Sequence, residues 1–169
     1  MKTESKKTYI GLFSALGYAV IVGADMLLKS WCAANIKGAT DVPLIPGVIR
    51  LTYTENTGAA FSVLEGGRWF FVWLGVAVVI ALLLLIRFDK HLRGSKWVMA
   101  SVTLMMAGTT GNLLDRLFQG YVIDMFHPEF VRFATFNIAD AALTLGGVGF
   151  CSYILFSKAY KRPAPASEP

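Results

Sequence analysis

The chain has 169 residues, of which 55% are hydrophobic and only 16% are charged, and its net charge is +5. A soluble domain usually carries about 25% charged residues. The basic residues stand at the ends of apolar runs and not along a polar face, which argues against nucleic-acid binding. Composition therefore predicts one membrane domain, residues 1–162, followed by a disordered Pro/Ala-rich tail, residues 163–169.

Four apolar runs are each long enough to cross a bilayer, which takes about 20 residues. In chain order they cover residues 9–28, 69–88, 97–114 and 138–156. The first could be a signal peptide, but its length and the lack of a clear cleavage site favour a retained helix. The third is rich in small and hydroxylated residues, which suits helix–helix contact in lipid. We predict an all-α membrane protein with four transmembrane helices.

The distribution of lysine and arginine predicts the orientation. Ten of the sixteen lie in the two termini and the 87–96 connection, and six lie in the longer connections 29–68 and 115–137. The positive-inside rule therefore places both termini in the cytoplasm and the two longer connections outside. No internal repeat is visible.

The first outer connection predicts a little β-structure. Residues 48–54 read Val-Ile-Arg-Leu-Thr-Tyr-Thr, rich in β-branched and aromatic side chains, and Pro43 and Pro46 precede them. This pattern indicates a short strand or hairpin. We expect a small extracytoplasmic β-sheet on the membrane surface, together with a short outer helix.

The chain lacks the residues that several common kinds of functional site require. Cys32 and Cys151 should be most of a bilayer apart, at about 1.5 Å per helical residue, so no disulfide is expected. The histidines are His91, in a predicted cytoplasmic loop, and His127. Zinc needs more histidines or thiols than this, a serine triad has no well-placed histidine, and no glycine-rich phosphate loop follows a strand. We expect no metal and no cofactor.

Polar and charged residues at the ends of the apolar runs require an explanation, because burying them in a membrane costs free energy. All of them fall toward the predicted outer face: Asp25, Lys29, Asn112, Asp115, Arg116, Asp124, Asn137 and Asp140. The third helix must leave the membrane on the side where the fourth begins. Asp124 and Asp140 therefore share a face whichever way the chain is inserted.

Helical spacing brings some of these residues into line. Two stripes are predicted, one on the third and one on the fourth helix: Gly108, Asn112 and Arg116, and Asp140, Thr144 and Gly147. A close, glycine-lined approach of the two helices could bring the stripes together. Asp124 stands in the short apolar segment 121–126, which would press its carboxylate against a nonpolar surface.

Two carboxylates in a low-dielectric site share a proton, because both cannot ionise cheaply. Such a pair can activate water with one member and protonate a carbonyl or leaving group with the other. Asp124 and Asp140 are therefore candidates for a catalytic pair.

Structural roles compete with this interpretation. Asp140 at a helix start could be an N-cap, Asp115 could serve a structural pairing beside Arg116, and Asp25 and Lys29 could neutralise each other. Asn56 and Gly58 could be turn residues. A proton-coupled transporter or a lipid-binding subunit also stays open, although the chain has no inverted repeat and only four predicted spans.

Five motifs in register narrow the choice. They are Asp25 with Lys29, Asn56-Thr-Gly-Ala-Ala-Phe61, Gly111-Asn-Leu-Leu-Asp-Arg116, Val122-Ile-Asp124 and Phe136-Asn-Ile-Ala-Asp140. Together they closely resemble the bacterial lipoprotein signal peptidases (signal peptidase II), over most of the chain from the first to the fourth helix.

The resemblance implies a membrane aspartyl endopeptidase that cleaves diacylglyceryl-modified prolipoproteins just before the lipidated cysteine, at the outer side of the cytoplasmic membrane. Asp124 and Asp140 match the catalytic pair. Asn112, Arg116 and Asn137 would hold the site and the substrate, and Asn56 and Gly58 would lie where the outer sheet meets the substrate. Asp25, Lys29 and Asp115 would support the site.

The resemblance also implies inhibition by cyclic peptide antibiotics such as globomycin. We expect membrane lipids as partners and a monomeric protein. One position departs from the family pattern. The family usually has Asp-Gln-x-x-Lys at the end of the first helix, and here Met26 replaces the glutamine. Met26 cannot make the hydrogen bonds of an amide, so the support around Asp25 is expected to differ.

Overall fold

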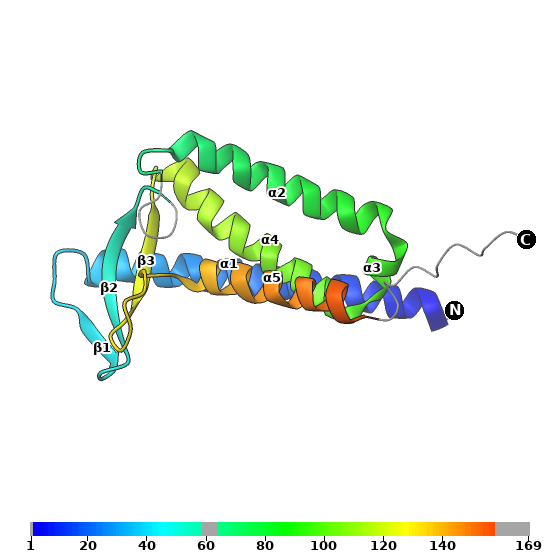
Figure 1. The fold of residues 1–169 in the computed structure, drawn as a ribbon, viewed down its shortest axis with the longest axis horizontal. Helices are drawn as coiled ribbons and strands as arrows, with labels where there is room; N and C mark the ends of the chain where they lie inside the picture. The colour runs from blue at the N-terminus through cyan, green and yellow to red at the C-terminus, as the bar shows by residue number, and fades with distance from the viewer. Residues whose placement is uncertain (1, 59–63, 158–169) are drawn as a thin grey trace, which may run out of the picture.

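The structure is a computed structural model that describes residues 2–58 and 64–157. The predicted tail, 163–169, and the last residues of the predicted domain, 158–162, therefore lie outside the described residues. The described part contains four long helices, one short helix and a three-stranded sheet at one end of the helices (Figure 1). The helices are α1 Lys2–Asn35, α2 Arg68–Phe88, α3 Lys90–Gly94, α4 Lys96–Phe118 and α5 Ile138–Phe156.

The four predicted long helices are all present. The bounds of α2, α4 and α5 lie within a few residues of the predicted runs, whereas α1 continues beyond residue 28 to Asn35. Asp25 and Lys29 therefore lie inside a helix and not at its end. The last two turns of α1 are stabilised as a helix because Cys32, and Ile36 just after the helix, pack against Leu51 and Ile123 of the sheet.

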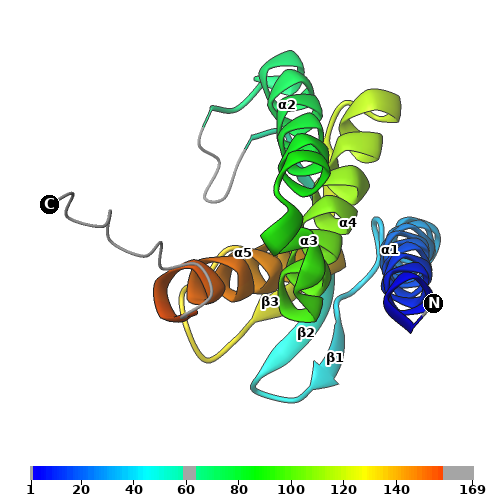
Figure 2. The same cartoon turned by 90° about the vertical axis from the view of Figure 1, so that its right-hand side faces the viewer.

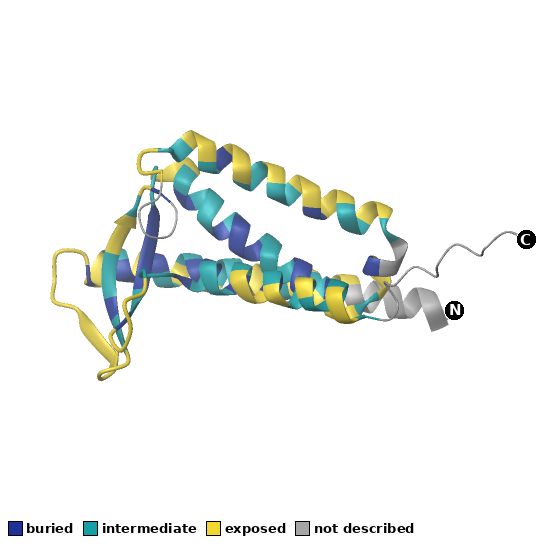
Figure 3. Ribbon diagram, in the orientation of Figure 1, coloured by how far each residue is buried: buried dark blue, intermediate teal, exposed yellow. Residues whose placement is uncertain are grey.

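Three helical segments are long and apolar enough to cross a membrane: Gly11–Asn35, Arg68–Phe88 and Ile138–Phe156. The fourth long helix, α4, is not among them, because serine, threonine, glycine and asparagine dilute its apolar residues. It lies at the centre of the bundle, between α1, α2 and α5 (Figure 2). Figure 3 shows the same contrast in burial, since α2 is largely exposed and the buried residues concentrate on α4 and the adjoining strand.

Glycines allow α4 and α5 to approach closely, as predicted, but one of the glycines is not the one expected. A Cβ atom on Gly108 would lie 2.2 Å from the backbone oxygen of Ala139, so only glycine fits there. On α5 the corresponding contact belongs to Gly146, whose Cβ would lie 2.6 Å from the Ser101 backbone oxygen. Gly147, which the predicted stripe included, makes no such contact, because an added Cβ would have nothing within 4 Å.

The sheet consists of β1 Val42–Ile45, β2 Ile49–Asn56 and β3 Val122–Pro128, in the order β1-β2-β3 with both pairs antiparallel. The predicted hairpin is confirmed by β1 and β2. The third strand was not predicted as a strand, although Tyr121-Val-Ile-Asp-Met-Phe126 has the β-branched and aromatic residues that favour one. The sheet lies across the ends of the helices (Figure 1).

The opposite end of the bundle holds the start of α1, the end of α5 and α3 (Figure 1). The short outer helix expected near the sheet is not confirmed, because the one short helix in residues 2–58 and 64–157 is α3, at this opposite end. The six lysines and arginines predicted to lie outside belong to the sheet end or to the helix turns that meet it.

The two cysteines do not pair, as expected. Cys32 is buried beneath the sheet and Cys151 is exposed on α5, and both are free thiols.

Candidate active site

Asp124 lies on β3, opposite Thr54 of β2, and only 2% of it is exposed. Both of its carboxylate oxygens accept hydrogen bonds from side-chain amides. Asn56 Nδ2 donates to Oδ2 at 2.9 Å, and Asn137 Nδ2 donates to Oδ1 at 2.7 Å. The apolar segment 121–126 buries this carboxylate, but the groups that contact its oxygens are polar amides and not the nonpolar surface that was expected.

Burial raises the pKa of the Asp124 carboxyl to about 7, and the neighbouring Asp140 carboxylate is the second cause. The hydrogen bonds from Asn56 and Asn137 act in the opposite direction and do not cancel the effect of burial. Near neutral pH, Asp124 is therefore able to hold or release a proton.

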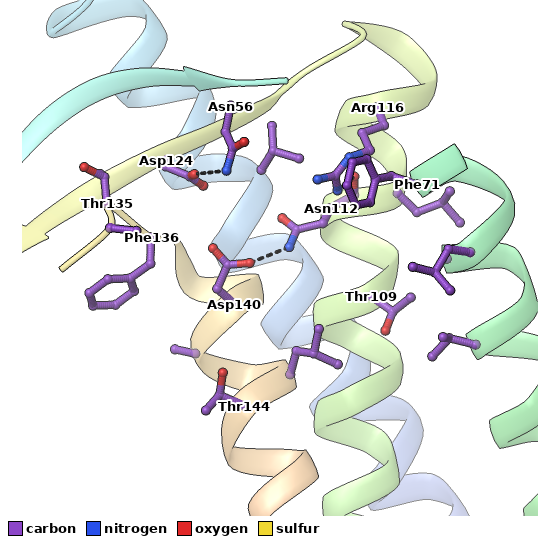
Figure 4. Close-up of a pocket in the computed structure, with 18 of the residues that line it drawn as sticks. Asn56, Phe71, Thr109, Asn112, Arg116, Asp124, Thr135, Phe136, Asp140 and Thr144 are labelled. Carbon is purple, nitrogen blue, oxygen red and sulfur yellow. Dashed lines mark hydrogen bonds between the residues drawn. The ribbon is translucent and has the colours of Figure 1, made fainter. Parts of the chain in front are cut away.

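Asp140 lies in the first turn of α5, where it takes part in a capping box and is not itself the N-cap. The N-cap is Asn137, whose Oδ1 accepts from the Asp140 backbone N–H at 2.8 Å. Asp140 Oδ2 accepts from the Asn137 backbone N–H at 3.2 Å, and Oδ1 accepts from Asn112 Nδ2 at 2.7 Å. The predicted meeting of the α4 and α5 stripes is thus confirmed at Asn112 and Asp140 (Figure 4).

Two amides link the two carboxylates. Asn137 Nδ2, which donates to Asp124, also lies 3.1 Å from Asn112 Oδ1, and Asn112 Nδ2 donates to Asp140. Asn137 is fully buried, and its Nδ2 contacts the backbone oxygen of Ile123 as well, at 3.3 Å. Because the polar atoms of both amides are engaged, these contacts fix the way each carboxylate faces.

A cleft of about 660 Å³ opens beside the two aspartates. Its polar end is formed by Asn56, Asn112, Arg116, Asp124 and Asp140 (Figure 4). The rest of its lining is mostly apolar and comes from α2, α4, α5 and the segment 133–136. The arrangement suits a ligand that is largely apolar and presents one polar group to the carboxylates.

Arg116 lines this cleft without an ion pair to either aspartate. Its Nη2 donates to the Gly58 backbone oxygen at 2.7 Å, and its guanidinium lies over the Phe71 ring, 4.7 Å from the centroid. It therefore joins α4 to the segment after β2 and to α2. Phe71 could not be singled out from the sequence, because an aromatic residue in an apolar run is ordinary.

Asn56 is both a turn residue and part of the site. Its Oδ1 accepts from the Gly58 backbone N–H at 3.0 Å, while its Nδ2 donates to Asp124. The turn orients the amide that holds the carboxylate, so Asn56 and Gly58 are turn residues and site residues at the same time. Residues 59–61 of this motif lie outside the described residues.

Asp25, Lys29 and Asp115 form a buried charge cluster behind the cleft and do not line it. Lys29 Nζ lies 2.7 Å from Asp25 Oδ2 and 2.9 Å from Asp115 Oδ2, and each of the three residues is at most 2% exposed. The expected Asp25–Lys29 pair is present. Asp115 pairs with Lys29 and not with its neighbour Arg116. Met26, which departs from the family pattern, is partly buried and is not among the residues that line the cleft.

His127 lies apart from the two aspartates' amide network. Its Nδ1 is 3.1 Å from Thr135 Oγ1, and both residues line a second groove of about 690 Å³ that adjoins the cleft at Asp124. The groove is more polar than the cleft and is formed by β2, β3 and the segment that follows β3.

The model of one protein family, signal peptidase (SPase) II, matches residues 18–156 of the chain. The chain belongs to the signal peptidase II family. This confirms the resemblance drawn from the five motifs.

Curated relatives agree with this assignment. A lipoprotein signal peptidase of Streptococcus agalactiae is 40% identical over 127 residues, which covers 75% of this chain and 81% of the relative. Lipoprotein signal peptidases of Latilactobacillus sakei and Lactococcus lactis are 42% and 41% identical, and the matches cover 85% and 84% of this chain. They cover 91% and 94% of those relatives.

Two solved bacterial membrane enzymes have the same fold. One superposes with a TM-score of 0.76 at 26% identity and covers 90% of this chain and 93% of that structure. The other has a TM-score of 0.78 at 28% identity, covering 86% of this chain and 94% of that structure. With its apolar helices and these neighbours, this signal peptidase II family member is a membrane protein and a peptidase.

Proposed function

We propose that this chain is an aspartyl endopeptidase that removes the signal peptide from diacylglyceryl-modified prolipoproteins, cleaving before the lipidated cysteine. The observation that carries the proposal is the pair of carboxylates at the polar end of an apolar cleft, each held by a side-chain amide. An apolar cleft suits a lipidated, hydrophobic signal segment, and the carboxylates suit the hydrolysis of a peptide bond.

The chemistry divides between the two aspartates. Asp124 serves as the proton donor, since burial raises the pKa of its carboxyl to about 7, and Asp140 serves as the proton acceptor. Asp140 removes a proton from water as the water oxygen attacks the scissile carbonyl carbon, and Asp124 donates its proton to the carbonyl oxygen. When the C–N bond breaks, the proton on Asp140 passes to the leaving nitrogen, and the hydroxyl proton of the intermediate returns to Asp124.

The other polar residues hold this arrangement. Asn112 and Asn137 orient the carboxylates, and Asn56 donates a hydrogen bond to Oδ2 of Asp124. Arg116 holds the Gly58 backbone beside the cleft, where that segment contacts the substrate backbone or the lipid head group. Asp25, Lys29 and Asp115 support the site from behind.

The proposal includes a topology in the bacterial cytoplasmic membrane. All four long helices span it, because α4 carries no charge between Trp97 and Leu114 and runs alongside the three apolar helices. Both termini then lie in the cytoplasm, where the larger number of lysines and arginines gathers, and the sheet and the two aspartates lie at the outer face. The enzyme acts as a monomer on substrate embedded among membrane lipids, and cyclic peptide antibiotics such as globomycin occupy the same cleft.

The test is cleavage of a lipidated prolipoprotein by Asp124→Asn and Asp140→Asn variants in a gel-shift assay. Each variant is expected to lose cleavage while it still folds, because a neutral amide cannot exchange protons with water or the leaving group. Full cleavage by either variant would contradict the two-aspartate mechanism. The same assay with unlipidated precursor separates this function from that of an intramembrane protease that cuts unlipidated helices. Solute or proton flux without cleavage would favour a transporter instead.

A further inference from the structure

Lys29 is a buried cation that lies outside the cleft yet contacts three residues connected to it. It is 2% exposed, and its Nζ reaches Asp25 Oδ2, Asp115 Oδ2 and Asn112 Oδ1 at 2.7, 2.9 and 3.2 Å. An ammonium group has three N–H donors and no acceptor. All three donors are therefore used, and the contacts define one position for the group.

Two of these contacts lead to the backbone directly beside the aspartates. Asp25 Oδ1 accepts from the Ala139 backbone N–H at 2.9 Å, and Ala139 immediately precedes Asp140. Asp115 Oδ2 accepts from the Ile123 backbone N–H at 3.2 Å, and Ile123 immediately precedes Asp124. Both Asp25 and Asp115 are 1% exposed, so solvent does not compete for these bonds.

The third contact leads to the same pair through a side chain. Asn112 Oδ1, which accepts from Lys29, belongs to the amide whose Nδ2 donates to Asp140 Oδ1 at 2.7 Å. A cation facing Oδ1 leaves Nδ2 as the atom that can face Asp140. Lys29, together with Asn137 Nδ2 at 3.1 Å from the same oxygen, determines which way this amide points.

We propose that Lys29 is a positioning residue for peptide hydrolysis, because its ammonium holds the two backbone segments that set the separation of Asp124 and Asp140. This inference rests on the proposed function of the two aspartates. It also assigns a role to α1, since the described residues that line the cleft come from the other elements and α1 reaches it through this cluster.

A positioning role and a merely structural role make different predictions. In the structural role, the ammonium only neutralises two buried carboxylates, and activity should return once those charges are removed together. In the positioning role, neutralising the cluster restores folding and leaves the aspartates without their common anchor. A shift of about 1 Å in a catalytic group can cost about a hundredfold in rate.

The experiment compares Lys29→Met with the neutral triple variant Asp25→Asn, Lys29→Met, Asp115→Asn. The asparagine oxygens can still accept from the Ala139 and Ile123 backbone N–H groups, so the triple variant lacks only the ammonium and the two charges. Unfolding in mixed micelles measures stability, and kcat and KM for a lipidated peptide are measured per folded enzyme.

Lys29→Met is expected to be strongly destabilised, and the triple variant is expected to regain most of the stability. The kcat of the triple variant should stay about a hundredfold below wild type, with KM within about twofold, since the cleft itself is unchanged. Wild-type kcat in a stable triple variant would overturn the proposal, and so would a loss confined to KM.

Asp25→Asn supplies a second test if the triple variant does not fold. It keeps the oxygen that accepts from Ala139 and turns an N–H₂ group toward Lys29, so it breaks one contact of the ammonium. A kcat reduced by about tenfold or more at unchanged KM is expected, and a wild-type kcat would overturn the proposal.

Tyr18→Phe is the matched control, because it removes another contact between α1 and α4, the 3.0 Å hydrogen bond from Tyr18 to Thr110 Oγ1. It should leave kcat at the wild-type value. Failure of this inference is distinguishable from failure of the proposed function. If only this inference fails, Asp124→Asn is inactive and the triple variant is active. If the proposed function fails, Asp124→Asn is active.

Discussion

Replacing Asp124 with asparagine is expected to stabilise the protein at alkaline pH while it abolishes cleavage. The carboxyl is 2% exposed, and burial is the largest cause that raises its pKa from 3.8 to about 7. Between these values the folded state keeps the proton and the unfolded state has lost it. Stability therefore falls as pH rises through this window. The gap of about three pH units, at about 1.4 kcal/mol each, amounts to a cost on the order of 4 kcal/mol above pH 7.

Asparagine avoids this cost because it is neutral at every pH. It introduces a smaller one, since Asn56 and Asn137 both donate to Asp124 and the new amide has only one oxygen to accept. A lost hydrogen bond of this kind costs about 1–2 kcal/mol. Asp124→Asn should therefore be about 2–3 kcal/mol more stable than wild type at pH 8 and about 1–2 kcal/mol less stable near pH 4.

The assay is SDS-induced unfolding in mixed micelles at several values between pH 4 and pH 8, which gives the free energy of unfolding for both proteins. The control is Glu65→Gln, which removes an exposed carboxyl beside the second groove. Its curve is expected to run parallel to wild type. Curves for Asp124→Asn and wild type that never cross would refute the reasoning, because they would mean that burial does not penalise the ionised carboxylate.

Two further predictions concern Arg116 and the glycines. Arg116→Ala loses the contact with the Phe71 ring and the charge-assisted hydrogen bond to Gly58, and that bond contributes about 1.5–3 kcal/mol. The value of kcat/KM should therefore fall by about ten- to a hundredfold, and Arg116→Lys should recover little of it. Wild-type kinetics in either variant would show that this contact is unimportant. Gly108→Ala forces a Cβ to 2.2 Å from the Ala139 backbone and should cost about 3 kcal/mol or more in unfolding free energy. Gly147→Ala, with nothing within 4 Å, should gain up to about 1 kcal/mol, and equal effects of the two substitutions would contradict the packing argument.

The sequence predicts the long helices well because membrane spans depend on length and hydropathy, which a single chain displays directly. It misplaces the end of α1, since the turns after residue 28 are stabilised by Leu51 and Ile123, which are distant in sequence. It misses β3 for the same reason. A seven-residue strand with one acid has a weak local signal, and its pairing with β2 fixes its conformation.

The contacts of the site also fall into those that the sequence predicts and those that it does not. A shared face for Asp124 and Asp140 follows from connectivity, and the meeting of Asn112 with Asp140 follows from helical spacing. The partner of Asp115 does not follow from either. Its sequence neighbour Arg116 suggests a local pair, but adjacent helical residues point in different directions, and the cation that reaches Asp115 comes from α1. Three-dimensional contacts decide such pairings, and the sequence holds no record of them.

Among the described long helices, the one that is not apolar enough by composition to cross a membrane, α4, is at the centre of the bundle, and its composition explains this position. Small residues such as Gly108 let α5 approach, and Asn112 and Asp115 need protein partners because lipid offers none. A helix with these residues is stable in a membrane only when other helices surround it, as α1, α2 and α5 surround α4. The features that weaken its hydropathy signal are therefore the ones that place its polar side chains against the two aspartates.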